Sequence, residues 1–230
     1  MNFLLAQNLC DSCPGDFEPL AGVTVGFEAA SFNLLFGGTG SGRNRLLRLL
    51  GLMERPQEGE IVIDGKSTRD WTGPECAEFR SRHFGFLFET PLLIPNFNVA
   101  ENIAMPLFKL TEANAEQARQ ETQRVLAHVG LPDEGESTIE SLPLWAQQRV
   151  ALARALVIRP RAILVENLDT FSRDGELIAL LDLLSATRQK MECCIIATAT
   201  HRDLSRFAQR VIEMKNGRMV GDTIPGGPFS

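Results

Sequence analysis

Short apolar segments alternate with helical segments along this chain. Continuous apolar runs predict buried strands at residues 31–36, 84–88, 162–165 and 194–197, and a strand that ends in an Asp-Gly turn at residues 59–65. Leucine, alanine and other helix-forming residues predict helices at residues 45–53, 111–129, 147–157 and 177–184. Because strands and helices alternate, the pattern indicates an α/β fold with a parallel sheet.

The composition restricts the class of protein. The chain has 230 residues, of which 44% are hydrophobic, so it is long enough to bury a substantial core. A formal net charge of −6 argues against a protein that binds nucleic acid electrostatically. The N-terminus lacks the basic and apolar regions of a signal peptide, and no segment approaches the roughly 20 apolar residues that span a bilayer. We therefore expect any membrane association to go through a partner.

The cysteines indicate a reducing compartment. There are five, Cys10, Cys13, Cys76, Cys193 and Cys194, and the odd number without a signal peptide favours reduced thiols in a cytosolic protein. Cys10 and Cys13 have the C-x-x-C spacing of a metal or redox site. No second ligand pair follows at a suitable spacing, so ordinary thiols are favoured over that alternative.

A glycine-rich segment directly after the first apolar run is the main candidate for chemistry. Its residues are Gly37, Gly38, Thr39, Gly40, Ser41, Gly42, Arg43, Asn44 and Arg45. A phosphate-binding P-loop has the pattern G-x-x-x-x-G-K-[ST] between a strand and a helix. Gly37 and Gly42 match its glycines, while Arg43 replaces the lysine and Asn44 replaces the magnesium-binding hydroxyl. The backbone N–H groups can still hold an anion, and the alternative is a tight turn without a ligand.

Segments that connect the motifs resemble the ATP-binding subunit of an ABC transporter of the lipoprotein-release and macrolide-export type. These segments are residues 51–56, 59–65, 85–89, 98–107 and 147–156. The resemblance covers nearly the whole chain and implies a single P-loop NTPase domain of ABC type over residues 1–230. It implies a mostly parallel sheet with flanking helices, an antiparallel β subdomain, and a small helical subdomain inserted at about residues 92–158.

The resemblance also assigns catalytic positions, and this chain departs from the family at most of them. Glu89 falls at the Q-loop glutamine, Glu166 at the magnesium-assisting aspartate and Asn167 at the catalytic glutamate. Asn167 cannot accept a proton from water, so the general base is lost. A one-residue shift makes Glu166 the base but puts Val165 at the aspartate position, so neither alignment gives an intact pair. His201 matches the switch histidine, with a hydrogen-bonded turn residue as the alternative.

The family's signature motif, L-S-G-G-[EQ], is also replaced. Its positions hold Leu142, Pro143, Leu144, Trp145 and Ala146. Pro143 has no N–H to donate to a γ-phosphate, and the bulk of Leu144 and Trp145 prevents a close approach of the backbone. We expect Trp145 to pack against a partner or against its own helix.

The remaining positions implied by the resemblance are weak matches. The family's adenine-stacking aromatic falls at Cys13, with Phe17 as a possible substitute, and Arg173 falls at the D-loop aspartate. Oxygen ligands for magnesium remain at three positions, Asn44, Glu89 and Glu166. ATP is therefore a candidate ligand, and any magnesium binding is expected to be weakened.

Subunits of this family dimerise head to tail, and each ATP lies between one P-loop and the opposite signature motif. In this chain both the P-loop and the signature motif are altered. A homodimer would therefore have two altered sites, and in a heterodimer with an intact subunit each site would still contain one altered motif from this chain. We hypothesise a hydrolysis-deficient subunit, cytoplasmic and held at the inner face of the membrane by a permease that binds near residues 89–107. The alternatives are a divergent, active ATPase that drives transport and a soluble interaction module without a permease.

Overall fold

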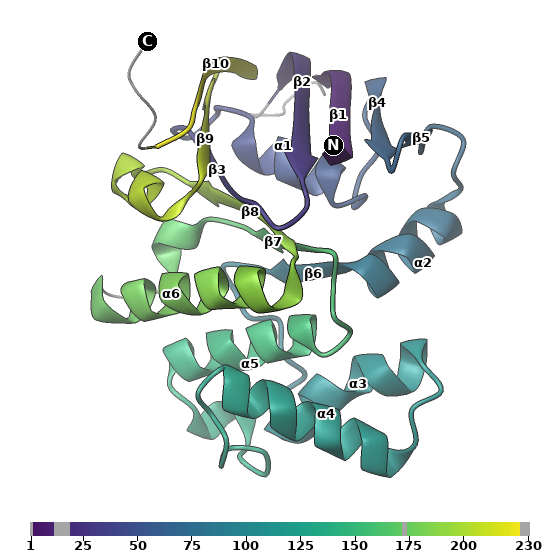
Figure 1. Ribbon diagram of the computed structural model, residues 1–230, viewed down its shortest axis with the longest axis vertical. Helices are drawn as coiled ribbons and strands as arrows, with labels where there is room; N and C mark the ends of the chain where they lie inside the picture. Colours follow the sequence, from purple (N-terminus) through teal and green to yellow (C-terminus); the bar gives the residue numbers. More distant parts are fainter. Residues whose placement is uncertain (1, 12–18, 172–173, 226–230) are drawn as a thin grey trace.

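The computed structural model describes residues 2–11, 19–171 and 174–225, and its strands form two sheets (Figure 1). The smaller sheet is antiparallel in the order β2-β1-β4-β5. Its strands are β1 (Asn2–Asp11), β2 (Leu20–Glu28), β4 (Glu58–Ile63) and β5 (Lys66–Ser67). This sheet is the antiparallel β subdomain that the sequence predicts.

The larger sheet has the order β10-β9-β3-β8-β7-β6 and is parallel except for the edge pair β9–β10. Its strands are β3 (Phe32–Phe36), β6 (Phe84–Leu87), β7 (Ala162–Val165), β8 (Cys194–Ala199), β9 (Arg210–Lys215) and β10 (Arg218–Thr223). Every residue of β7 and β8 is buried, as expected for parallel strands covered on both faces. The α/β fold with a mostly parallel sheet is confirmed.

Six α-helices and three short 3-10 helices complete the described chain. They are α1 (Arg43–Leu50), α2 (Gly73–His83), α3 (Val99–Leu110), α4 (Ala115–His128), η1 (Ile139–Ser141), α5 (Leu144–Leu156), η2 (Leu168–Thr170), α6 (Asp174–Met191) and η3 (Arg202–Phe207). Helices α3, α4 and α5 pack on one another at one end of the molecule (Figure 1). No helix within the described ranges is long and apolar enough to cross a membrane.

Helix α1 lies between the two sheets, and its leucines explain that position. Leu46, Leu49 and Leu50 are completely buried in a core cluster that also contains Leu4 of β1 and Leu164 of β7. The four leucines of α1 lie on one face of the helix, and this amphipathic pattern directs that face into the core. This packing fixes the N-terminal turn of α1, where the glycine-rich segment ends.

Several predicted boundaries differ from those of the structure. Helix α4 begins at Ala115 rather than at residue 111, because the Asn114 side chain caps the helix and Gln117 completes a capping box. Helix α5 begins at Leu144 rather than at residue 147. The last three signature positions are therefore helical. Helix α6 extends beyond residues 177–184 at both ends.

Candidate functional site

The loop of residues 37–42 leads from the carboxyl end of β3 into α1. Gly42 has φ of 89°, and a Cβ there would lie 2.8 Å from the Pro19 carbonyl oxygen. A Cβ on Gly37 would lie 2.5 Å from the Met214 carbonyl oxygen. Ser41 N–H donates to the Gly38 carbonyl at 3.1 Å, which closes the turn. The fold itself therefore requires both glycines of the pattern.

The same loop keeps open space for a ligand. A Cβ on Gly38 would meet no atom within 4 Å, so this part of the loop faces free volume. No described side chain caps the N-terminus of α1 at Gly42. The first N–H groups of a helix lack partners within the helix and attract anions. The geometry thus fits a phosphate group.

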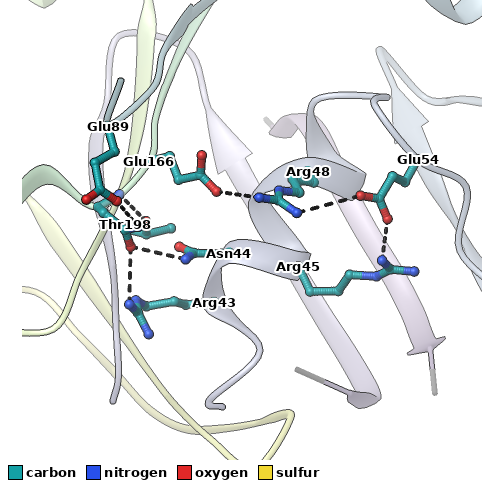
Figure 2. A network of polar contacts seen from close by, with 9 residues as sticks. Arg43, Asn44, Arg45, Arg48, Glu54, Glu89, Glu166 and Thr198 are labelled. Atoms are coloured by element: carbon teal, nitrogen blue, oxygen red, sulfur yellow. Dashed lines mark hydrogen bonds and ion pairs between the residues drawn. The ribbon is translucent and has the colours of Figure 1, made fainter. Parts of the chain in front are cut away.

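Arg43 lies folded back over this loop (Figure 2). The residue is only 4% exposed. Its Nη1 donates to the Gly38 carbonyl at 2.7 Å and to Ser41 Oγ at 3.5 Å, and its Nη2 donates to Asn167 Oδ1 at 3.2 Å. All three acceptors are uncharged, and the buried Nε has no hydrogen-bond partner among the described residues. Arg43 therefore keeps the positive charge of the P-loop lysine in a buried place.

Asn167 contacts three other altered positions, Arg43, Asn44 and Glu89. Its Oδ1 accepts from Arg43 and, at 3.1 Å, from Asn44 Nδ2, while its Nδ2 donates to Glu89 Oε2 at 3.1 Å. Its backbone N–H donates to Thr198 Oγ1 at 2.8 Å. Asn167 has φ of 50°, a left-handed conformation that asparagine tolerates. The sequence-predicted positions are brought together here, and both the oxygen and the nitrogen of the Asn167 side chain form hydrogen bonds.

The Glu166 carboxylate is neutralised by a cation from α1. Arg48 Nη2 lies 2.9 Å from Glu166 Oε1, and Arg48 Nη1 lies 4.0 Å from Glu54 (Figure 2). Arg45 also pairs with Glu54, and its Nε donates to the buried Asp11 carboxylate at 2.7 Å. The chain Asp11–Arg45–Glu54–Arg48–Glu166 is called the ionic ladder below. It balances the carboxylate at the magnesium-assisting position within the protein.

The three candidate magnesium positions do not fit a magnesium ion. Mg²⁺ requires near-octahedral oxygen ligands, usually with one or two carboxylates. Glu166 is paired with Arg48, and Glu89 accepts from Asn167. Asn44 Oδ1 is buried and has no hydrogen-bond partner among the described residues, but it is a single amide oxygen. Throughout the described ranges, no three His, Cys, Asp or Glu side chains gather as a metal site.

The switch position shows a different set of contacts. His201 is exposed at the start of η3. The neighbouring Thr200 is held by Asp169, whose Oδ2 accepts from the Thr200 backbone N–H at 2.8 Å. Asp169 and Thr198 were not predicted from the sequence. Asp169 follows the buried strand β7, and Thr198 lies near the end of the buried strand β8. Their place at the carboxyl edge of the sheet could have identified them as candidates from the sequence.

The signature positions are partly buried. Leu142 and Ala146 are buried, whereas Leu144 is 55% exposed. The Arg149 guanidinium lies 5.0 Å from the centre of the Trp145 ring, so Trp145 packs against its own helix. Pro143 precedes the first helical residue of α5 and offers no N–H there.

The predictions for Cys13, Phe17 and Arg173 lie outside the described residues. The four described cysteines are free thiols. Cys10 is half-buried, and its Sγ accepts from the Gly22 N–H at 3.2 Å. Burial raises the pKa of Cys193 to about 11 and that of Cys194 to about 12. Both groups are therefore unreactive thiols at neutral pH.

Comparisons with known proteins agree with the resemblance drawn from the sequence. A family model described as ABC transporter matches residues 20–168. The lipoprotein-releasing system ATP-binding protein LolD of Chromohalobacter salexigens is 33% identical over 213 residues, which cover 91% of this chain and 88% of that protein. The macrolide export ATP-binding/permease protein MacB of Burkholderia pseudomallei is 32% identical over 214 residues, which cover 91% of this chain and 32% of that protein.

A solved structure gives the same result at the level of the fold. MJ0796, a dimeric ATP-binding cassette in a post-hydrolysis state bound to ADP and Pi, superposes with a TM-score of 0.87 and 26% identity. The superposition covers 97% of this chain and 99% of that one.

Proposed function

The chain belongs to the ABC transporter family, and we propose that it is a hydrolysis-deficient ATP-binding subunit that serves as a structural or regulatory partner of a membrane permease. The bonding of Asn167 supports this function most directly. ATP hydrolysis requires a group that orients and deprotonates water, and an amide cannot take that proton. The Asn167 side chain is also held by Arg43, Asn44 and Glu89, so it is not available to orient water.

The expected loss of activity is large. A positioned general base contributes roughly 10²- to 10⁴-fold to a rate. Removal of one electrostatic donor from a preorganised site costs about 10²- to 10³-fold. The chain lacks the family's base, its magnesium hydroxyl and its signature donors. Turnover is therefore expected to fall by about 10⁴-fold or more relative to an intact cassette.

The nucleotide site itself is retained in this proposal. The loop of residues 37–42 keeps its shape and its open volume at Gly38, and α1 offers an uncapped N-terminus within the described chain. The relative LolD is named an ATP-binding protein, and MJ0796 was solved with ADP and Pi. We place the phosphate chain of ATP over this loop, beside Arg43.

The permease is proposed to dock at a cleft between α2, β6, α3 and α5. The cleft has a volume of about 720 Å³, and Phe86 and Met105 are among its lining residues. Phe97 and Phe108 are exposed beside it, at 37% and 57%. Exposed aromatic side chains around a hollow mark protein interaction sites. The cleft includes Met105 and Pro106 of the predicted docking segment, residues 89–107, while most of its lining belongs to α2, β6 and α5. Docking there would hold the chain at the cytoplasmic face as a homodimer or a heterodimer with another ABC subunit.

Phosphate release from saturating ATP with Mg²⁺ tests the lack of hydrolysis. The purified chain, alone and reconstituted with its permease, is expected to show no release above a buffer control. Turnover that Glu166→Gln abolishes, while the exposed Glu112→Gln leaves it unchanged, would contradict the proposal.

A divergent, active ATPase is the second candidate. Glu89 favours it, because this carboxylate lies 3.1 Å from Asn167 Nδ2, beside a cavity of about 610 Å³ that Asn44 and Glu166 also line. In that case Glu89 would act as the base. Loss of turnover in Glu89→Gln would identify this alternative.

A further inference from the structure

Arg43 is a buried cation whose described partners are all neutral. Its hydrogen bonds go to a carbonyl, a hydroxyl and an amide oxygen, and its Nε has no partner in the described chain. Taking a charge out of water is costly unless a counter-charge compensates it. The neighbouring carboxylates are engaged elsewhere, Glu166 by Arg48 and Glu89 by the Asn167 amide. Among the described residues, Arg43 therefore has no anionic partner.

A divalent cation is poorly accommodated at the same place. The Arg43 guanidinium bonds directly to Asn167, and Asn44 bonds to the same oxygen. A magnesium ion bound by Asn44 would lie close to this fixed positive charge and would be repelled by it. The ionic ladder removes Glu166 as a compensating ligand, because Arg48 already neutralises it. The charge that magnesium supplies in other phosphate sites is supplied here by the chain.

We propose that the loop binds the phosphate chain of a nucleotide in its metal-free form, with the Arg43 guanidinium as the counter-charge. This inference rests on the nucleotide site of the proposed function. On binding, Arg43 exchanges the neutral oxygens of Gly38 and Asn167 for charged phosphate oxygens. A guanidinium can contact two phosphate oxygens at once, and such charge-assisted hydrogen bonds are stronger than neutral ones. The N–H groups of the first turn of α1, which no described side chain caps at Gly42, complete the cradle.

Equilibrium dialysis of the full chain with labelled ATP, in EDTA and in excess Mg²⁺, tests this inference. The Kd in EDTA is expected to equal or fall below the Kd in Mg²⁺, because Mg²⁺ converts the preferred free anion into a complex. Magnesium that tightens binding more than about threefold would overturn the inference. Absence of saturable binding up to millimolar ATP in both buffers would overturn it as well.

Competitors identify the part of the nucleotide that is recognised. Tripolyphosphate is expected to displace ATP in EDTA, and adenosine is expected to have no effect. Displacement by adenosine without displacement by tripolyphosphate would show that the base alone is bound, and would refute a phosphate site at Arg43.

Two variants assign the effect to residues. Arg43→Met removes the charge and is expected to weaken ATP binding in EDTA by at least tenfold, whereas the exposed Arg218→Met control leaves it unchanged. The double variant Arg43→Lys with Asn44→Ser restores the family's pair and is expected to make binding magnesium-dependent. An unchanged affinity in the first variant, or unchanged metal independence in the second, would refute the role of these positions. Thermal unfolding establishes that each variant is folded, and the wild-type comparison needs no variant.

These outcomes are separable from those that test the lack of hydrolysis. Magnesium-dependent binding without turnover would overturn only the metal-free mode. Turnover with metal-independent binding would overturn only the proposed lack of hydrolysis.

Discussion

None of the described contacts of the Arg43 guanidinium is a carboxylate. Replacing Asn167 by aspartate places a carboxylate next to this guanidinium. The change is nearly isosteric, and aspartate tolerates the positive φ of 50° at this position. The shape of the side chain is therefore kept, while its charge changes and the hydrogen bond that Asn167 Nδ2 donates to Glu89 is lost. The new oxygen facing Arg43 would lie near 3.2 Å from Nη2, and the one facing Glu89 near 3.1 Å from Oε2.

The two new interactions have opposite signs and different strengths. At an effective dielectric constant of about 20, unit charges at that separation attract by about 5 kcal/mol. Glu89 is exposed, so its repulsion is screened by water to about 1 kcal/mol. Desolvation of the new carboxylate offsets much of the difference. We expect Asn167→Asp to stabilise the chain by about 1–2 kcal/mol, and to raise Tm by roughly 2–8 °C.

The same substitution is expected to weaken ATP binding. Once Arg43 has a carboxylate partner, a phosphate must compete with it, so the Kd in EDTA should rise at least tenfold. Circular dichroism melts and equilibrium dialysis measure the two effects. Asn216→Asp is the matched control, because Asn216 also has positive φ, at 49°, and lies exposed in the turn between β9 and β10. A lower Tm, or an unchanged affinity for ATP, would refute the role of Arg43 as an uncompensated buried cation.

Three other perturbations test separate parts of the structure. Arg45→Met leaves the 2% exposed Asp11 without its cation and should lower the free energy of unfolding by about 3 kcal/mol in urea titrations, and a loss below about 1 kcal/mol would contradict this. Burial raises the pKa of the Cys194 thiol to about 12, so this thiol should resist a thiol reagent at pH 8 until the chain unfolds. Because the pKa of the thiol in the unfolded chain is near 9, the contribution of Cys194 to stability should be lost as pH rises above about 9. Phe108→Asp should reduce co-sedimentation with permease-containing membranes at least tenfold, while Val220→Asp, similarly exposed on β10, should not.

The fold was largely predictable because apolar runs specify buried parallel strands. The strand at residues 162–165 has the predicted bounds. The helix boundaries were predicted less accurately than the strands. The predicted start at residue 111 ignores the Asn114 cap, and the predicted start of α5 at residue 147 is three residues late. The first error concerns a side-chain cap, whereas α5 begins directly after Pro143 without one.

The candidate site was predictable as a set of positions but not as a set of contacts. The spacing of glycines indicates the loop, and counting along the chain places Glu166 and Asn167 at the end of a strand. It does not indicate that Arg48 pairs with Glu166, because these residues are 118 positions apart and meet only through the packing of α1. A basic residue one turn after the loop, at Arg48, was visible in the sequence, but its partner was not.

Four of the predicted site positions, Arg43, Asn44, Glu89 and Asn167, contact one another. A lysine at position 43 lacks the second arm with which Arg43 bonds both Gly38 and Asn167. A glutamate at position 167 would place a carboxylate beside Glu89, which would then repel it. The amide at 167 satisfies both neighbours, since its oxygen accepts from Arg43 and its nitrogen donates to Glu89. Restoring a glutamate at 167 therefore removes the donor to Glu89, and restoring a hydroxyl at 44 removes the amide that donates to Asn167 Oδ1, so each of these reversions loses a contact within the network.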